Sequence, residues 1–316
     1  MRLATIDNGT ADGALIAVSR DARRCLHAGA TMQQAIEHWE QVEPRLRALA
    51  ARLEEGEGEA LDHQRLLAPL PRAWQWLDGS VFPQHGVLMQ QAFNLPPIET
   101  DRPLMYQGLS DRFLPGHADV PLPSEADGID FEGEYGVITD AVPMGTTPDD
   151  AMAHIRLVIL INDWSLRAIA PIEMKTGFGW VQAKPACAAA PFALTPDELG
   201  EAWKDGRVHL PMQVALNGQW FGHPQGGEMA FGFHELVAHA ARSRDLVAGT
   251  IIGSGTVSNA DYVRAGSACI SERRAIEMID SGAPQTPFMR FGDRVRLEAE
   301  GGMFGAVDQR VVGAFA

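Results

Sequence analysis

The sequence predicts an α+β protein, in which a small N-terminal domain is followed by a larger, β-rich domain with few helices. The helical signal lies between Thr31 and Glu55, where apolar residues recur on one face and Arg and Glu cover the others. The β signal is strongest where Met212–Leu216 and Gln219–Phe221 flank Asn217-Gly218. This dipeptide favours the tight turn of a β-hairpin, so the two flanking segments are expected to pair.

The N-terminal domain is expected to end in a proline-rich stretch. Turn-forming residues place the boundary near Gln91–Pro97, which gives one domain over residues 1–95 and a second over residues 96–316. Within the first domain, Pro44 is expected to divide the helical region, because proline is tolerated in a first helical turn but not in an interior. Gly56 is expected to end it.

Further elements are predicted in the β-rich part. Thr147 is expected to cap a short helix that opens at Pro148, because its side chain can accept a hydrogen bond from the first turn. The other predicted elements are a strand through Ile129–Ile138, a buried strand at Leu157–Ile161, an amphipathic helix at Phe233–Ser243 and a hairpin formed by Val295–Glu300 and Met303–Val307.

Composition excludes several classes of partner. The net charge is −15, which disfavours nucleic acids and anionic membranes, because positive patches usually bind both. No apolar run reaches the ~18 residues that span a bilayer, and the N-terminus lacks the apolar core of a secretory signal. We therefore expect a cytoplasmic protein. Cys25, Cys187 and Cys269 have no disulfide or zinc spacing and are expected to be inert thiols.

Two acids in Ile129–Gly136 are the first candidates for chemistry. Side chains alternate along a strand, so Glu132 and Glu134 point the same way. Two like charges on a buried face are costly unless a cation offsets them, and carboxylates suit Mg²⁺, Ca²⁺ or Mn²⁺. Asp130 shares that face as a rival ligand. The alternative is that the face is solvated.

Other polar residues stand at the ends of predicted elements. Asp163 follows a buried apolar strand, where a rigid scaffold can fix a functional acid, although it could equally bind the backbone of a turn. Asp111 could supply another carboxylate, and His117 could serve as a general base near neutral pH. The alternative for both is an exposed loop position.

Two glycine-containing segments suit a substrate that develops negative charge. Lys184 follows Gly177-Phe178-Gly179 and could stabilise that charge, or could be a surface lysine. The glycines of Gly253-Ser254-Gly255-Thr256 let the backbone approach a ligand, and Thr256 adds a hydroxyl, although a plain turn explains this segment too.

Taken in order, these segments resemble the fumarylacetoacetate hydrolase family. The matching set is Ser110-Asp111 with Phe113, Glu132-Gly133-Glu134, Asn162-Asp163-Trp164-Ser165 with Arg167, Lys184, and Gly253–Ser258. The resemblance covers residues from Arg102 to the C-terminus. It implies a catalytic domain of mixed β-roll type and a homodimer.

The resemblance also implies roles for individual residues. It implies a divalent cation (Mg²⁺, Ca²⁺ or Mn²⁺) bound by Asp111, Glu132, Glu134 and Asp163. Lys184 would act beside the bound substrate, with Phe113, Arg167 and Thr256 as further substrate contacts. His117 would activate water, and Glu272 would orient that histidine.

The implied activity is metal-dependent cleavage of a carbon–carbon bond in a β-diketo acid, such as fumarylacetoacetate or an acylpyruvate. The chain departs from the family at Ala168 and Ala170, where an acid and a substrate-binding glutamine are expected. Two alternatives therefore stay open. One is a decarboxylase or isomerase of the same family, and the other is a non-catalytic relative that binds a metabolite.

Overall fold

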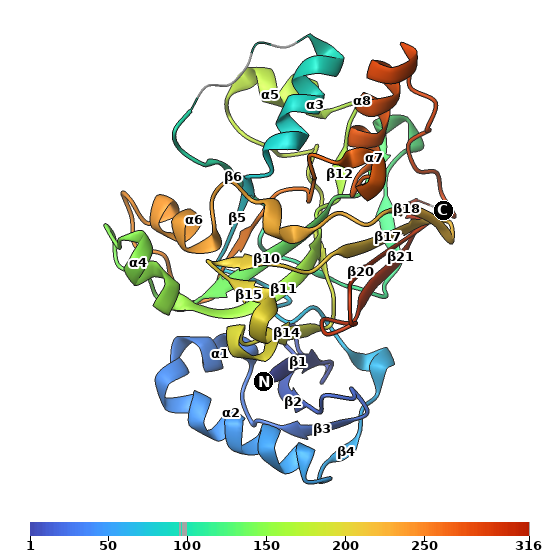
Figure 1. Cartoon of the computed structure of the whole chain (residues 1–316). Coiled ribbons are helices and arrows are strands. Elements are labelled where there is room, and N and C mark those ends of the chain that lie inside the picture. The colour runs from blue at the N-terminus through green and yellow to red at the C-terminus, as the bar shows by residue number, and fades with distance from the viewer. Residues whose placement is uncertain (95, 97–99, 316) are drawn as a thin grey trace.

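The protein folds around one large mixed β-sheet and a second, five-stranded sheet, with helices along their faces (Figure 1). The computed structural model describes residues 1–94, 96 and 100–315. The predicted α+β class, with a β-roll type catalytic part and a smaller N-terminal part, is confirmed. The large sheet has the order β4-β3-β2-β1-β14-β11-β10-β19-β5-β6, with β13 bridging β11 and β7.

Its strands come from the whole length of the chain. They are β1 (Arg2–Ile6), β2 (Ala14–Val18), β3 (Arg24–His27), β4 (Glu59–Ala60), β5 (Gln75–Ser80), β6 (Leu104–Gly108), β7 (Leu114–Pro115), β10 (Gly133–Thr139), β11 (Ile155–Asn162), β13 (Ala188–Ala189), β14 (Phe192–Leu194) and β19 (Thr250–Gly253). The five-stranded sheet has the order β18-β17-β20-β21-β8, from β8 (Val120–Leu122), β17 (Met212–Leu216), β18 (Gln219–Gly222), β20 (Arg294–Ala299) and β21 (Ala306–Gly313). Two short pairs complete the strands: β9 (Ile129–Asp130) with β12 (Ser165–Leu166), and β15 (Trp203–Lys204) with β16 (Arg207–Val208).

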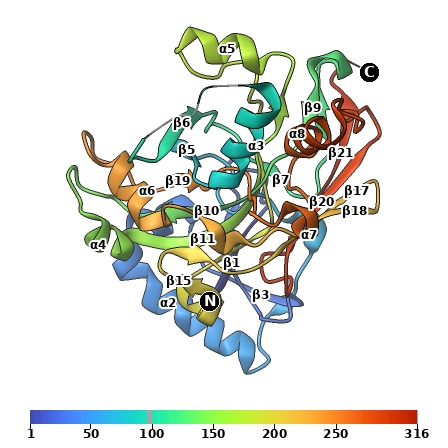
Figure 2. The same cartoon turned by 45° about the horizontal axis from the view of Figure 1, so that its top comes forward.

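The helices lie at the ends and faces of these sheets. They are α1 (Met32–Glu37), α2 (Trp39–Glu54), α3 (Pro83–Phe93), α4 (Pro148–Ala151), α5 (Ala170–Thr176), α6 (Phe233–Ala240), α7 (Tyr262–Ala265) and α8 (Ile270–Ser281), with 3₁₀ turns at His63–Arg65, Glu125–Asp127, Met152–His154, Pro196–Ala202 and Gly226–Glu228. Helix α3 packs against α8. Helix α5 lies at the same end of the molecule, away from α2 and the N-terminal strands (Figures 1 and 2).

The N-terminal helical region breaks at a different residue from the one predicted. Thr31 caps α1 in a capping box with Gln34, and the chain then leaves helical geometry at His38. Pro44 lies inside the continuous helix α2, so the prediction that it divides the region is wrong. The interruption at His38 starts α2 five residues before Pro44, and the helix continues past the proline because a buried leucine face holds it on β2 and β3. It ends before Gly56, as predicted.

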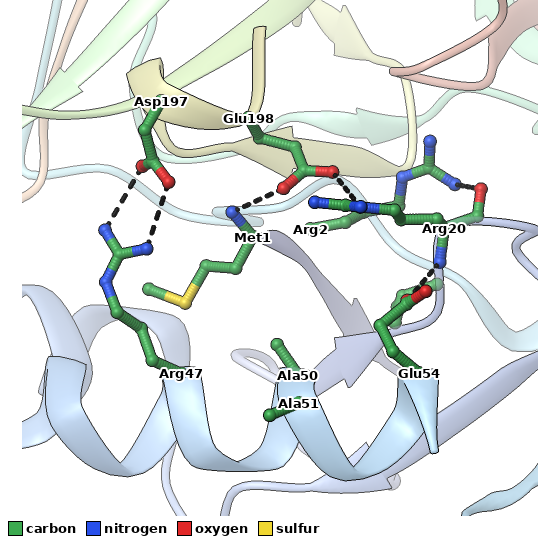
Figure 3. A pocket seen from close by; sticks show the side chains of 10 residues that line it. Met1, Arg2, Arg20, Arg47, Ala50, Ala51, Glu54, Asp197 and Glu198 are labelled. Carbon is green, nitrogen blue, oxygen red and sulfur yellow. Dashed lines mark hydrogen bonds and ion pairs between the residues drawn. The ribbon is translucent and has the colours of Figure 1, made fainter. Parts of the chain in front are cut away.

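The N-terminal strands are continuous with the rest of the molecule. Strand β1 pairs antiparallel with β14, which extends the large sheet across the predicted division. Ion pairs reinforce this junction: Arg47 of α2 binds Asp197, and Arg20 binds Glu198, around a cavity of about 220 Å³ (Figure 3). The predicted boundary between residues 95 and 96 adjoins positions 95 and 97–99, which lie outside the described residues, so it stays a prediction.

Several local predictions hold. Asn217 and Gly218 both adopt positive φ (52° and 76°) between the paired strands β17 and β18, which is the geometry of a tight hairpin turn. Thr147 accepts a hydrogen bond from the Asp150 amide at the start of α4. Strands β20 and β21 also pair as expected.

The centre of the large sheet is fully buried, and it positions the polar residues described next. All seven residues of β10 are buried, as are seven of the eight in β11, because helices and the second sheet cover both faces. Strand β10 pairs with β11 on one side and with β19 on the other, and β19 pairs with β5. Among the described residues, no helix combines the length and the apolar character needed to cross a bilayer.

Candidate metal centre and active site

Three carboxylates from strands β5, β10 and β11 meet near the centre of the large sheet. Asp78 lies on β5, Glu134 on β10, and Asp163 directly after β11. In the register of the sheet, Asp78 is paired with Gly253 of β19, which is the strand next to β10, and Glu134 is paired with Ile161 of β11. One carboxylate oxygen of each acid lies within 4.8 Å of those of the other two. We refer to Asp78, Glu134 and Asp163 as the acidic triad.

The triad is buried, and its charge is poorly compensated. Neither carboxylate oxygen of Glu134 accepts a hydrogen bond from any described residue. Burial and the charge of Asp78 hold the pKa of Glu134 well above its usual range, and burial together with Asp163 raises the pKa of Asp78 to about 8. Three hard oxygen donors that converge in a buried space are a donor set that fits Mg²⁺, Mn²⁺ or Ca²⁺.

Glu132 is satisfied by protein donors instead. Its Oε1 accepts hydrogen bonds from Lys184 Nζ (2.7 Å), Arg167 (2.8 Å) and Ser165 (2.6 Å), and its Oε2 accepts one from the Thr256 hydroxyl. Burial alone would raise the pKa of Glu132, but the two cations outweigh it and hold that pKa well below its usual range. Glu132 therefore stays ionised and anchors the two cations.

Lys184 connects Glu132 to the triad. Its Nζ donates to Glu132 and also to Asp163 Oδ2, at 2.5 Å. The Tyr106 hydroxyl donates to the same Asp163 oxygen at 2.6 Å, and the Cys187 thiol donates to Oδ1 at 2.9 Å. Burial would lower the pKa of Lys184, but Asp163 and Glu132 raise it, so the ammonium ion persists beside the triad.

A histidine–glutamate pair lies on the two helices that pack at this end of the sheet. His85, in the first turn of α3, places Nδ1 2.9 Å from Glu272 Oε2, and Glu272 is buried in the first turn of α8. A carboxylate bound to Nδ1 fixes the tautomer and leaves Nε2 as the nitrogen that can accept a proton. Because α3 follows β5 directly, His85 and Asp78 come from consecutive elements.

The start of α8 is tied to the residues around Glu132. Asp130 accepts hydrogen bonds from the amides of Ile270 (2.7 Å) and Ser271 (2.9 Å), and it also binds Arg167 at 2.8 Å. The backbone of Glu132 forms a β-bridge with Cys269, the N-cap of α8. A continuous polar network thus links Glu272 with Glu132 through α8, Asp130 and Arg167.

Comparison with known protein families decides which family this geometry represents. The model for the C-terminal domain of fumarylacetoacetate (FAA) hydrolase matches residues 75–312, and the model for fumarylacetoacetase N-terminal domain 2 matches residues 1–72. The chain belongs to the fumarylacetoacetate hydrolase family. The predicted resemblance is confirmed, and the family's C-terminal model includes β5 and α3, which carry Asp78 and His85.

Individual members of the family with different activities resemble the chain at low identity. A 2,4-didehydro-3-deoxy-L-rhamnonate hydrolase from Sphingomonas sp. (strain SKA58) is 25% identical over 181 residues, which are 54% of this chain and 60% of that protein. The match thus spans less than two thirds of that relative. The oxaloacetate tautomerase YisK from Bacillus subtilis (strain 168) is 23% identical over 242 residues, 75% of this chain and 70% of that protein.

A solved structure extends the likeness over the whole chain. It is a maleylpyruvate hydrolase from Sphingobium sp. SYK-6 in complex with manganese(II) and pyruvate. Its TM-score is 0.68 at 16% identity, covering 99% of each chain, so this likeness concerns the fold.

The structure brings together most of the residues that the sequence analysis selected. Glu134 and Asp163 belong to the triad, and Glu132, Lys184, Arg167 and Thr256 form the hydrogen-bonded group beside it. Glu272 lies at the same end of the sheet, where it binds His85 and not the predicted His117. Their predicted roles in binding metal and substrate stay predictions.

Three other selected residues lie elsewhere. Asp111 and His117 are both exposed, because the chain between β6 and β8 runs along the surface on either side of the short strand β7. Asp78 takes the place in the cluster that was assigned to Asp111, and His85 takes the place beside Glu272 that was assigned to His117. Phe113 is 3% exposed and packs edge-to-face on Trp76 in the core, and its predicted substrate contact stays a prediction.

Asp78, His85 and Tyr106 were not selected from the sequence. A signal for the first two exists: Trp76-Leu77 is an apolar pair that ends in the acid Asp78, and His85 follows Pro83, which opens a helix. This segment was assigned to an N-terminal domain without chemistry because prolines surround it. Nothing in the local pattern of Tyr106 distinguishes it from a structural tyrosine.

Gly253→Ala is expected to weaken metal binding. A Cβ at this position would lie 2.6 Å from Asp78 Oδ1 and 2.3 Å from the Trp76 ring, so Asp78 must move out of the triad. Displacing one group that positions a metal typically weakens affinity by about 10–100-fold. Calorimetric titration with Mn²⁺ measures the change, and a cooperative thermal unfolding transition shows that the variant is folded. Wild-type affinity in this variant would contradict the placement of Asp78.

Proposed function

We propose that the protein is a metal-dependent hydrolase that cleaves a carbon–carbon bond of a β-diketo acid, such as fumarylacetoacetate or an acylpyruvate. The observation that carries the proposal is the buried acidic triad, with the unpartnered carboxylate of Glu134, beside Lys184. A metal centre of hard donors suits a substrate that chelates through neighbouring oxygens, which a diketo acid does. The His85–Glu272 pair adds a candidate base at the same end of the sheet.

Asp78, Glu134 and Asp163 would hold a divalent cation, Mg²⁺, Mn²⁺ or Ca²⁺, with Glu132 beside them as the partner of Lys184 and Arg167. When bound, the cation would act as a Lewis acid that polarises the substrate carbonyl. Manganese in the maleylpyruvate hydrolase of the same fold supports this cofactor class. We also propose that the protein acts in the cytoplasm as a homodimer.

The chain's own residues would perform the remaining steps. With an acylpyruvate as substrate, His85, held in one tautomer by Glu272, removes a proton from water, and the resulting hydroxide attacks the carbonyl carbon at position 4. The bond between carbons 3 and 4 then breaks, and its electron pair passes to the pyruvate half as an enolate. Lys184 stabilises the negative charge of this half, and Arg167 and Thr256 hold the Glu132 carboxylate that positions Lys184. Protonation of carbon 3 completes pyruvate, and the other half leaves as a carboxylate.

The second candidate is an isomerase, tautomerase or decarboxylase of a keto acid. The similarity to an oxaloacetate tautomerase over three quarters of the chain supports this candidate. Such an enzyme would use the triad in the same way, but His85 would move a proton on the substrate instead of activating water. A non-catalytic relative is the least favoured, because Lys184, the triad and the His85–Glu272 pair are all in place.

Hydrolysis in isotopically labelled water tests the proposal. The protein is treated with a chelator, reloaded with Mn²⁺ or Mg²⁺, and given acetylpyruvate in H₂¹⁸O. We expect pyruvate and acetate, with one solvent oxygen in each new acetate carboxylate, and no reaction before the metal is restored. Turnover of oxaloacetate without acetylpyruvate cleavage would favour the second candidate. No turnover of any keto acid would reject an enzymatic role.

A further inference from the structure

A protruding segment begins and ends inside the candidate site. It comprises residues 169–182, including α5, and we call it the apolar arm. Its two ends meet where the Leu166 amide donates to the carbonyl of Ala183 (2.8 Å). Arg167 and Lys184, which flank the arm, both bind Glu132. Figures 1 and 2 show α5 standing out from the sheet at the end where α3 and α8 lie.

Internal hydrogen bonds give the arm a defined shape. The carboxylate of Glu173 on α5 accepts the backbone amides of Val181 (3.1 Å), Gln182 (2.8 Å) and Ala183 (3.0 Å). These bonds, first of all the one from Gln182, lower the pKa of Glu173, so it is ionised at neutral pH. The segment of the arm that follows α5 is therefore tied back to that helix, and Trp180 is held near the base of the arm.

Trp180 contacts the site directly. Its ring meets the ring of Tyr106 edge-to-face, with centroids 5.8 Å apart and an interplanar angle of 74°. The Tyr106 hydroxyl binds Asp163 of the triad, and Lys184 Nζ lies 5.5 Å from the Tyr106 ring centroid. Tyr106 and Trp180 thus form an aromatic wall beside the group that would bind the substrate's keto acid end.

The charged groups next to this wall are already engaged. Arg167 binds Asp130 and Glu132, and Lys184 binds Glu132 and Asp163. Four large apolar side chains are exposed on the arm: Ile172 (68%), Met174 (65%), Phe178 (96%) and Val181 (83%). Its one basic residue is Lys175. The surroundings therefore favour an apolar group over a second carboxylate, which would need a cation of its own.

We propose that Tyr106 and Trp180 form the subsite for the distal end of the substrate, and that this end is an apolar aryl or alkyl group. This inference rests on the proposed hydrolysis of β-diketo acids and names the substrate class: an acylpyruvate with an apolar acyl group, as opposed to a dicarboxylate. The ring of Trp180 packs against the acyl group.

Three substrates that share the diketo acid end test the inference. They carry a methyl, a phenyl or a carboxyvinyl group at the distal end. We expect the wild-type holoenzyme to have its highest kcat/KM with the phenyl substrate. Trp180→Ala is expected to raise KM for the phenyl substrate, relative to the methyl one, by about tenfold. The reason is that the variant loses one aromatic contact with the phenyl ring and the area that this contact buries. Melting temperatures of both proteins confirm folding.

Two control variants make the result decisive. Trp220→Ala removes another exposed tryptophan, on β18, and Lys175→Ala removes the cation of the arm. Neither is expected to change the phenyl-to-methyl ratio. A preference for the carboxyvinyl substrate that Lys175→Ala abolishes would overturn the inference and leave the proposed function intact. An unchanged phenyl-to-methyl ratio in Trp180→Ala would also overturn the inference. If an oligomer dissociated in that variant at the same time, the exposed apolar arm would instead be a contact between subunits. No turnover of any of the three substrates would reject the proposed function itself.

Discussion

Glu134→Gln is expected to abolish metal binding and to lower metal-dependent turnover by about 10³-fold. Glu134 is the triad member whose two oxygens receive no hydrogen bond from the described residues. Its carboxylate therefore makes no hydrogen bond with these residues that stabilises the fold, and a bound cation would explain its presence. Glutamine keeps the shape but removes the charge that neutralises the cation. In the metal-free state the variant should be at least as stable as the wild type, because an uncompensated buried carboxylate has been removed.

Glu132→Gln is the matched comparison, since both acids are buried and only two residues apart. Glu132 binds Lys184 and Arg167, and breaking a buried ion pair by removing one partner typically costs about 3–5 kcal/mol. This variant should therefore melt at a lower temperature even without metal. Thermal unfolding with and without Mn²⁺ separates the two effects: Mn²⁺ should stabilise the wild type and leave Glu134→Gln unchanged. Full Mn²⁺ stabilisation of Glu134→Gln would show that the cation binds elsewhere.

Part of this site could be predicted because its signals are local. Strands β10 and β11 are apolar runs, and acids at Glu134 and Asp163 interrupt or end them. Pairing of Gly133 with Asn162 brings the two acids together in the folded protein. Lys184 and Thr256 were found because glycines precede them, and their hydrogen bonds to Glu132 follow from the same cluster of strands.

The missing part depends on contacts between distant segments. Asp78 enters the cluster because β5 pairs in parallel with β19, and the Gly255 amide binds it from 177 residues away. No local pattern indicates that register. The same pairing explains the glycines of Gly253–Thr256: the amide of Gly255 (φ 76°) binds a triad acid, whereas the sequence suggested that this backbone approaches a ligand. Asp111 was preferred because its neighbours matched a family pattern, although its loop stays on the surface.

His85→Gln is expected to lower kcat by about 10²–10⁴-fold, the usual contribution of a general base, while metal binding remains. The reason is the geometry of the pair: Glu272 is buried, and it fixes His85 Nδ1 at 2.9 Å, so the base is presented on Nε2. Because the His85 side chain is 20% exposed, added imidazole should reach the space left in His85→Ala and restore part of the rate. A purely structural histidine would not respond to imidazole.

His117→Gln is the control that separates the two histidines that have been considered as the base. His117 is exposed on the loop after β7, and its replacement should leave turnover and melting temperature unchanged. Glu272→Gln should fall between the two, with a smaller loss of kcat and a displaced pH–rate profile, because Glu272 positions the base and does not meet the substrate. Loss of turnover in His117→Gln, with normal rates in His85→Gln, would return the catalytic role to the surface histidine and leave the buried pair a structural one.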